Sequence, residues 1–383
     1  MRGIPLAWLQ LIRERRRLAA AIAGITFAVT LMLVQLGLRD ALYRNATKVH
    51  DRFRCDLAIV SSQYEYIFSS HPFTQRRLYS ALALPEVQSV APVYVGVGAF
   101  RDITKHQEHK LLVIGIDPTT HIFDFPGFDS QLPRLRQEDV GLFDLAARPE
   151  FGPVQQALER AGSVSTEING RRTTIEGSFR LGPSFGANAH YITSDLNFLR
   201  LFPSRRQGLV DIGLIYLRPG TDLEKARRRL VALLPDDVHV FTRTEFVDAE
   251  RSYWSLHLPI GFIFNLGSTL GLIVGMVIVY QILYTDVNDH LSEYATLKAM
   301  GYQDRALYSV VLQEALLLSC FGYLPGIVIA QGVYVLAQQR ARIPIEMTLS
   351  RGVLVFLMTV VMCGISGGIA MRKLAAADPA EIF

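Results

Sequence analysis

The chain has 383 residues, of which half are apolar and 19% charged, and its formal net charge is only +4. A mean hydropathy of +0.24 is high for a soluble protein, and the small net charge gives no reason to expect nucleic acid as a partner. Three cysteines are too few for an extensive disulfide framework. The composition therefore indicates a membrane protein.

The first 17 residues join an apolar segment to a dense group of arginines, and we assign them as a cytoplasmic amphipathic elbow helix. Trp8 suits the headgroup level of a membrane, and the arginines suit anionic phosphates. A plain extension of the following helix is the alternative. The positive-inside rule places this part of the chain in the cytoplasm. The arginines concerned are Arg2, Arg13, Arg15, Arg16 and Arg17.

Four charge-poor stretches are each long enough to cross a bilayer, which requires roughly 20 apolar helical residues. Because only a helix satisfies its own backbone within hydrocarbon, we predict four transmembrane helices. Glu314 is the one charged residue in the third of them. No small-x-small cleavage site follows the first, so we expect a retained anchor rather than a signal peptide. The predicted ranges are 18–40, 258–285, 306–336 and 352–371, with the second helix able to begin near residue 245 as a stalk.

The segment between the first two helices, residues 41–257, is predicted to be a large α+β domain on the periplasmic side. With four spans both termini lie in the cytoplasm, and Arg372 and Lys373 in the tail 372–383 agree with this orientation. Three arginines near the predicted periplasmic loop 337–351 oppose it, but the N-terminal cluster is denser. We therefore place the chain in the inner membrane. The opposing residues are Arg340, Arg342 and Arg351.

Turn and cap signals divide the 41–257 segment into strands and helices. Asn169-Gly170 between two β-prone runs is a strong type I′ hairpin signal. Thr221-x-x-Glu224 and Thr242-x-x-Glu245 match the capping box, so a helix should begin at each. The second of these helices is expected to run unbroken into the membrane. The other predictions are strands at 57–61, 87–100, 111–116, 164–168, 171–177, 212–217 and 238–241 and helices at 74–83, 149–161 and 194–201.

One short motif suggests catalysis. Gly182-Pro-Ser184-Phe-Gly186 matches the G-x-S-x-G nucleophile elbow, which needs a strand before the serine, a helix after it, and a positioned histidine and acid. Poor helix formers follow Gly186, and nothing in the sequence connects His190 or another downstream histidine with Ser184. We favour a glycine-rich loop, and a membrane-anchored serine hydrolase using Ser184 is the alternative of another class.

No catalytic residue, bound cofactor or metal is otherwise predicted in this chain. The sequence lacks G-x-x-x-x-G-K-[ST], so it has no P-loop that could hold a nucleotide. His106, Glu108 and His109 lack the i, i+4 spacing of a metal site on a helix. They are expected to lie on a solvated hairpin.

Small residues mark two of the membrane helices. Gly267, Gly271 and Gly275 repeat every four residues, which lets backbones approach closely and predicts a packed helix–helix seam. Residues 364–368 have a similar pattern. Glu314 has two interpretations, a proton relay or a partner for a cytoplasmic-side arginine or polar group. Because four spans are few for a solute pathway, we expect a homodimer.

The predicted cytoplasmic link, residues 286–305, contains the sequence EYATLKAMG, which predicts a short helix ended by glycine. This segment resembles the coupling-helix motif E-x-[AG]-x-L-[KR]-A-[LM]-G of the FtsX/MacB superfamily of ABC transporter permeases. That superfamily shares the order of one helix, a large extracytoplasmic domain and three helices. The resemblance implies that the link contacts an ATPase through Glu293, Tyr294, Ala295, Leu297, Lys298, Ala299, Met300 and Gly301.

Within that superfamily the chain is most similar to the DevC family, the permeases of DevBCA exporters. The segments that carry this resemblance include PLAWLQLIRERRRL, QLGLRDALY, TSDLNFLR and FIFNLG. The resemblance implies a homodimeric permease with a DevA-like ATPase that holds ATP and Mg²⁺. It also implies a DevB-like periplasmic membrane-fusion adaptor, a TolC-like outer-membrane protein reached through it, contact with membrane lipids, and export of glycolipids or other lipophilic cargo. The same fold acting as a signal transmitter or a lipoprotein extractor is the alternative.

Overall fold

The computed structural model describes residues 15–257, 259–290, 296, 300, 304–341 and 345–376. The chain forms two compact units, one made of Met1–Leu42 and Pro259–Phe383 and the other of Tyr43–Leu258. They are termed the membrane unit and the middle domain below. Residues 1–14 of the predicted elbow and most of the predicted coupling link lie outside the described residues.

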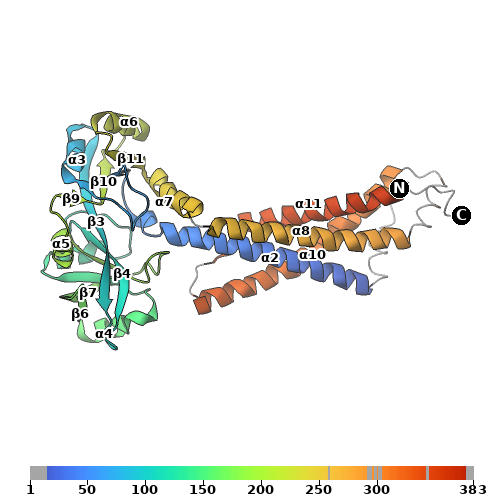
Figure 1. Cartoon of the computed structure of the whole chain (residues 1–383), viewed down its shortest axis with the longest axis horizontal. Coiled ribbons are helices and arrows are strands. Elements are labelled where there is room, and N and C mark those ends of the chain that lie inside the picture. The colour runs from blue at the N-terminus through green and yellow to red at the C-terminus, as the bar shows by residue number, and fades with distance from the viewer. Residues whose placement is uncertain are drawn as a thin grey trace. The chain divides into compact units, whose positions relative to one another are not determined.

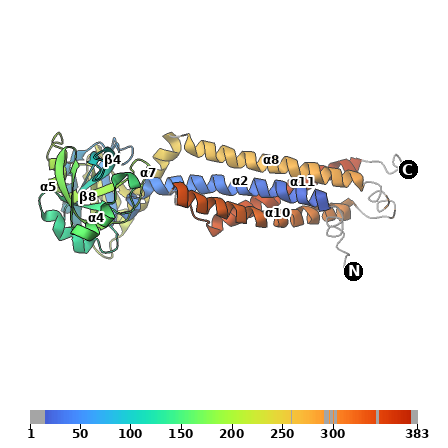
Figure 2. The same ribbon diagram turned by 90° about the horizontal axis from the view of Figure 1, so that it is seen from below.

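Four long helices form the membrane unit (Figure 1), and among the described residues these four are long and apolar enough to cross a membrane. They run side by side (Figure 2). The prediction of four membrane helices in a one-plus-three order is therefore confirmed, and the chain is a membrane protein. The helices are α2 Arg15–Thr47, α8 Ile260–Asp289, α10 Asp304–Ala341 and α11 Leu349–Ala376.

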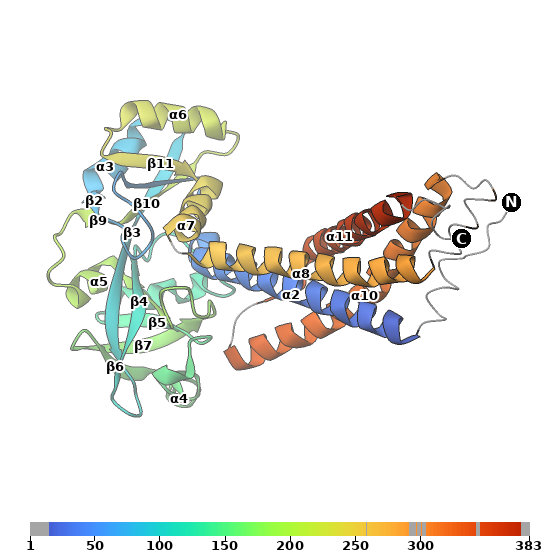
Figure 3. The ribbon, with the colours of Figure 1, turned by 45° about the vertical axis from the view of Figure 1, so that its right-hand side comes forward.

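The middle domain is built on a mixed nine-stranded sheet, of order β11-β1-β10-β3-β4-β8-β5-β7-β6, and a two-stranded sheet of β2 and β9 (Figure 3). The pairs β4–β8 and β5–β7 are parallel. Because β3 also pairs with β6, the strands from β3 round to β6 close on themselves. The bounds are β1 Leu57–Ser61, β2 Phe73–Thr74, β3 Val87–Arg101, β4 Glu108–Ile116, β5 Val140–Asp144, β6 Val164–Ile168, β7 Arg171–Phe179, β8 His190–Ser194, β9 Leu209–Val210, β10 Ile212–Leu217 and β11 Val238–Thr242.

Two apolar cores lie on opposite faces of this sheet. Side chains alternate along a strand, so Leu111 and Val113 of β4 enter one core whereas Leu112 and Ile114 enter the other. All four are buried. The central strands are therefore apolar on both faces, and they form a rigid base for the polar clusters at their ends.

Short helices flank the sheet, most of them at predicted positions, whereas the 3₁₀ helices at 50–52 and 129–136 were not predicted. The predicted helix 149–161 is interrupted at Gly152, whose φ of +84° belongs to the left-handed region. The α-helices are α3 Gln75–Ser80, α4 Val154–Ala161, α5 Asp195–Leu201, α6 Leu223–Leu233 and α7 Arg243–His257, and the 3₁₀ helices are η1 His50–Arg52, η2 Ala81–Ala83, η3 Asp129–Arg136 and η4 Pro149–Phe151.

Two of the three local signals in this domain are confirmed. Asn169 and Gly170 have φ values of 52° and 74°, as a type I′ hairpin requires. At the start of α7, the amide of Thr242 donates to the Glu245 carboxylate at 2.8 Å, and the Glu245 amide donates back to Thr242 Oγ1 at 3.2 Å. This is the predicted capping box.

The cap predicted at Thr221 is wrong by one residue. Asp222 is the N-cap of α6, and its side chain accepts from the Lys225 amide at 3.0 Å. Aspartate is as strong an N-cap as threonine, so the pattern of residue types allowed both registers.

The expected continuous helix from residue 245 into the membrane is also not found. α7 ends at His257 and α8 begins at Ile260, with Pro259 as the α8 N-cap. Proline has no amide hydrogen to donate within a helix, and the helix is interrupted at Pro259. The segment from 245 to 289 is therefore two helices rather than one stalk.

Candidate functional site

The predicted coupling link, residues 286–305, begins within the last turn of α8, which ends at Asp289. Residues 291–295, 297–299 and 301–303 lie outside the described residues, so the roles predicted for most of the link stay predictions. Thr296 is helical, and its carbonyl accepts from the Met300 amide at 3.0 Å. The Met300 side chain is 64% exposed. An exposed methionine at this position is available for contact with another protein.

An ionic cluster holds the end of α8 against the start of α2. Asp289 accepts a hydrogen bond from Arg17 of α2 at 2.6 Å, and Asp286 lies 3.8 Å from the same guanidinium. His290 Nδ1 is 3.7 Å from Asp286. Carboxylates at a helix C-terminus are unfavourable with the helix dipole unless a cation compensates them, and Arg17 supplies that cation. The cluster fixes the position from which the link departs.

Glu314 is buried in α10, with 1% of its surface exposed. In the described part of the chain its Oε2 atom has no hydrogen-bond partner. The charged group that interacts electrostatically with the Glu314 carboxyl is Asp286 of α8. The sequence leaves open a proton relay or a partner for an arginine or polar group, and no arginine is seen to pair with Glu314 among these residues. Two acidic groups therefore lie on adjoining helices near the same end of the bundle.

The glycine stripe of α8 packs against α2. A Cβ atom at Gly267 would come within 2.6 Å of Gln35, and one at Gly275 would come within 2.7 Å of Ala28. Gly271 faces Leu31 in the same way. These glycines therefore lie close to α2 within one chain, and Gly275 also lies close to Met362 of α11.

A second glycine seam, which was not predicted from the sequence, lies between α2 and α10. Gly322 and Gly326 form a G-x-x-x-G pair, which was a usable signal. Thr26 and Thr30 of α2 donate to the carbonyl oxygens of these two glycines at 3.1 and 3.2 Å. α2 thus packs against glycines of two helices, α8 and α10.

Among the α11 glycines, Gly367 packs against Val311, Leu283 and Ala315, whose side chains would lie 3.4–3.6 Å from a Cβ there, but Gly364 and Gly368 do not form such a seam. Among the described residues, a Cβ at Gly364 would have only Leu312 within ordinary contact distance, and one at Gly368 would have nothing within 4 Å. They line a groove between α10 and α11 with cavities of about 320 and 270 Å³ that share Leu312 and Gly364. The pattern that predicts close packing in α8 therefore leaves open space in α11.

Arg351 is one of the three arginines that opposed the predicted topology, and the structure buries its side chain in an ion pair. Its guanidinium lies 2.7 Å from Asp40 of α2 and donates to the Glu346 carbonyl at 2.8 Å and the Tyr334 hydroxyl at 3.3 Å. Tyr334 in turn donates to the Leu33 carbonyl. The arginine is 4% exposed and serves to join three helices, so it does not act as a loop charge.

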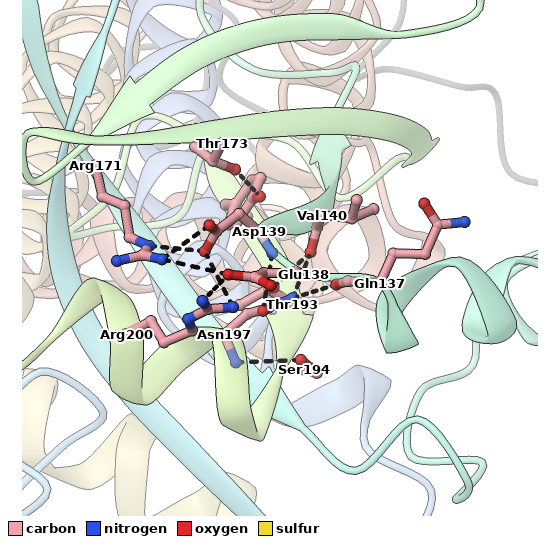
Figure 4. Close-up of polar contacts among 11 residues, drawn as sticks. Gln137, Glu138, Asp139, Val140, Arg171, Thr173, Thr193, Ser194, Asn197 and Arg200 are labelled. Carbon is pink, nitrogen blue, oxygen red and sulfur yellow. Dashed lines mark hydrogen bonds and ion pairs between the residues drawn. The ribbon is translucent and has the colours of Figure 1, made fainter.

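A polar cluster in the middle domain fixes the start of β5 (Figure 4). Arg171 binds Asp139 through two hydrogen bonds of 2.7 and 2.9 Å. Asn197 of α5 accepts from the Asp139 amide at 2.9 Å and donates to the Val140 carbonyl at 3.2 Å. Arg200 pairs with Glu138. These partners satisfy one another, which indicates a structural clamp on the turn before β5.

The motif around Ser184 differs most from expectation, because a histidine does reach it. His190 Nε2 lies 3.0 Å from Ser184 Oγ, and His190 Nδ1 lies 3.2 Å from Asp144. This is the order of groups in a serine hydrolase triad. However, His190 and Asp144 are fully buried, no helix follows the serine, and the Ser184 amide bonds back to the Ala187 carbonyl at 2.9 Å. This geometry favours a structural role, in which His190 and Asp144 hold the loop in place, over a catalytic role for Ser184 as an exposed nucleophile.

A second buried cluster lies on α7. Glu250 accepts hydrogen bonds from the Tyr64 hydroxyl and the Ile67 amide, both at 3.0 Å, and from Trp254 Nε1 at 2.9 Å. His50, just after α2, is 3.0 Å from the same tyrosine hydroxyl. Burial raises the pKa of Glu250 to about 7 and lowers the pKa of His50 to about 3. No sequence pattern marked these residues.

This cluster predicts a pH-dependent stability. Because the pKa of Glu250 rises from 4.5 to about 7 on folding, its contribution is present below pH 4.5 and is lost as pH rises through 7. The depressed pKa of His50 acts oppositely: its contribution is present above pH 6.5 and is lost as pH falls towards 3. Glu250→Gln should abolish the loss at higher pH, which amounts to about 3 kcal/mol.

The measurement is the thermal unfolding temperature of the whole chain in detergent between pH 5 and pH 8. Glu108→Gln, at an exposed glutamate of β4, is the matched control and should keep the wild-type profile. Identical profiles for wild type and Glu250→Gln would contradict the assignment.

The fold and these sites define a membrane protein with one helix before, and three after, an inserted α+β domain. Residues 265–379, which include most of α8 and all of α10 and α11, match the family described as FtsX-like permease C-terminal. This part of the chain is therefore similar to the C-terminal part of FtsX-like permeases. This match is to the broad FtsX-like family and does not distinguish the DevC family within it.

ABC transporter permeases are similar to nearly the whole chain. An ABC transporter permease of Mycobacterium tuberculosis, itself uncharacterised, is 21% identical over 97% of this chain and 96% of its own length. The pyoverdine export ATP-binding/permease protein PvdT of Pseudomonas syringae pv. tomato is 25% identical over 98% of this chain. The chain spans 58% of PvdT.

Solved structures align more loosely. The periplasmic region of MacB from Actinobacillus actinomycetemcomitans aligns with 52% of this chain and 94% of its own length, at 10% identity and a TM-score of 0.35. The extracellular domain of the ABC-type transporter YknZ from Gram-positive bacteria aligns with 45% of this chain and 90% of its own length, at 14% identity and a TM-score of 0.32.

Proposed function

We propose that this chain is the permease subunit of an ABC-type exporter, and that it acts as a homodimer with a separate ATPase subunit. The observation that carries the proposal is the similarity to FtsX-like permeases within a one-plus-three set of membrane helices. The sequence contains no P-loop, so the partner ATPase would bind ATP and Mg²⁺. PvdT, named as an ATP-binding/permease protein, supports the association of such a permease with ATP binding.

The proposed mechanism is mechanical coupling. ATP binding closes the ATPase subunits, which push on the 286–305 link, and α8 and α2 carry the motion to the middle domain. That domain then drives lipophilic cargo into a periplasmic adaptor and a TolC-like outer-membrane duct. The resemblance to the DevC family supports the adaptor and the cargo class. The ionic cluster of Arg17 with Asp289 supports the first step, because it ties the start of the link to α2.

In the proposed orientation the chain lies in the inner membrane with the middle domain in the periplasm. We expect single cysteines at the exposed positions Ser62, Glu108 and Lys225 to react with a membrane-impermeant maleimide from outside. Cysteines at Lys298 and Ala380 should react only after permeabilisation. The background is a variant lacking the three native cysteines. Protection of all three middle-domain positions in intact spheroplasts would refute the orientation.

The proposed division of labour predicts that the purified chain alone does not hydrolyse ATP. Its complex with the partner ATPase should hydrolyse ATP with normal turnover. Phosphate release by both preparations is the measurement, with an ATPase carrying an inactivated Walker A lysine as the control. Turnover by the chain alone that survives repurification would overturn the division of labour.

A further inference from the structure

The two connections between the middle domain and the membrane helices meet on one loop of the middle domain. Lys48 follows directly after α2 and donates to the Pro183 carbonyl at 2.9 Å. Trp254, near the end of α7, packs its ring against Phe185 with 4.3 Å between centroids. Residues 182–186, termed the joint loop, are therefore held from both connections.

The other side of the joint loop is bonded to the central sheet. Asp144, the last residue of β5, accepts from the amides of Leu181 and Gly182 at 3.0 and 2.9 Å. His190, the first residue of β8, holds Ser184 Oγ with one ring nitrogen and Asp144 with the other. β5 and β8 are neighbours within the closed part of the sheet. The loop thus joins the strand ends to the two connections.

The hydrogen bonds of Asp144 at the start of the joint loop are strong because the carboxylate is buried and charged. Burial acts to raise the pKa of Asp144, but the hydrogen bond and charge of His190 and the two amide donors outweigh it and lower the pKa. Asp144 therefore stays a carboxylate, and charge-assisted hydrogen bonds are stronger than neutral ones. At the far end of the loop, Gly186 lies so close to the Phe68 ring that a Cβ there would overlap it.

Trp254 is itself held in one orientation. Its indole nitrogen donates to Glu250 of the same helix, and its ring meets Tyr66 edge-on at 5.2 Å between centroids. The Phe185 ring is half-buried against it, so a shift of α7 cannot occur without moving the ring or breaking this contact. α7 leads through residues 258 and 259 into α8, the helix that precedes the predicted link.

We propose that the joint loop is the mechanical joint through which α2 and α7 move the sheet of the middle domain. Ser184, His190 and Asp144 are positioning residues that transmit the displacement to β5 and β8, and they do not catalyse hydrolysis. This inference rests on the proposed export function. It assigns a role to the G-P-S-F-G motif that explains both its triad-like geometry and its burial.

The functional test uses the full chain assembled with its partner ATPase in proteoliposomes. Phe185→Ala and Ser184→Ala should each lower ATP-dependent export at least about 10-fold while ATP turnover stays within about 2-fold of wild type. Tyr79→Ala and Ser165→Ala, at exposed positions of the same domain, are the matched controls and should export normally. Phe185 is half-exposed, so its truncation leaves both apolar cores intact. Normal export by both joint variants would overturn the inference.

A second measurement does not depend on export. In the resting chain, Trp254→Ala should speed hydrogen–deuterium exchange at the amides of 182–187 several-fold, and unchanged exchange would contradict the joint. Labelling of wild-type Ser184 by a fluorophosphonate probe would identify a hydrolytic site and also overturn it. A different outcome separates the two proposals. If the wild-type chain shows no ATP-dependent export but exchange at 182–187 still responds to Trp254→Ala, the export function is wrong, whereas the contacts of the joint loop are supported.

Discussion

Leu297→Asp should detach the partner ATPase and abolish export, while the middle domain stays folded. Leu297 and Met300 are three residues apart and share one face of the predicted link helix, and Met300 is exposed. Burying a leucine side chain in a partner's cleft contributes about 1.5–3 kcal/mol, and the central contacts of an interface dominate its affinity. A carboxylate placed there loses that gain and adds a desolvation cost.

The measurement is ATPase retention on the purified permease in detergent, with adaptor retention recorded in parallel. Leu297→Ala should weaken binding about 10–100-fold, the equivalent of losing the leucine's contact. Thr296→Asp, a carboxylate on the neighbouring position, controls for added charge. If Leu297→Asp retains the ATPase with normal turnover, the link is not the coupling element.

Asp40→Leu should destabilise the membrane unit more than any other single change among its described polar contacts. It leaves the Arg351 guanidinium buried without its carboxylate. Breaking a fully buried ion pair costs about 3–5 kcal/mol, and because the Asp40 side chain is 37% exposed we expect about 2–3 kcal/mol. The carbonyl and tyrosine contacts of Arg351 remain but carry no compensating charge.

Thermal unfolding in detergent measures this effect, and a loss of roughly 5–10 °C is expected. The double variant Asp40→Leu/Arg351→Leu removes both charges and should recover most of the loss, whereas Asp40→Glu should retain the pair. Equal unfolding temperatures for Asp40→Leu and wild type would show that the pair contributes nothing.

Local signals succeeded where neighbouring residues decide the structure. The hairpin at Asn169-Gly170 follows from two residues that accept positive φ, and the capping box of α7 follows from two side chains three positions apart. The same kind of signal failed at Thr221, where an adjacent aspartate took the cap. It also failed at Pro259, which lies in an apolar run that otherwise favours one long helix.

By itself the sequence determined the four membrane helices, the positions in the chain of seven of the eleven described strands, and the small-residue face of α8. Each of these depends on the composition and spacing of residues close together in the chain. Only the tertiary structure decided which groups meet. Asp144 and His190 are 46 positions apart, and Asp40 and Arg351 are 311 apart. Such pairs are set by how strands and helices pack, and no local pattern of residue types encodes that packing. The sequence therefore predicts the glycine-rich loop at 182–186 but not the bonds that connect it with His190 and Asp144.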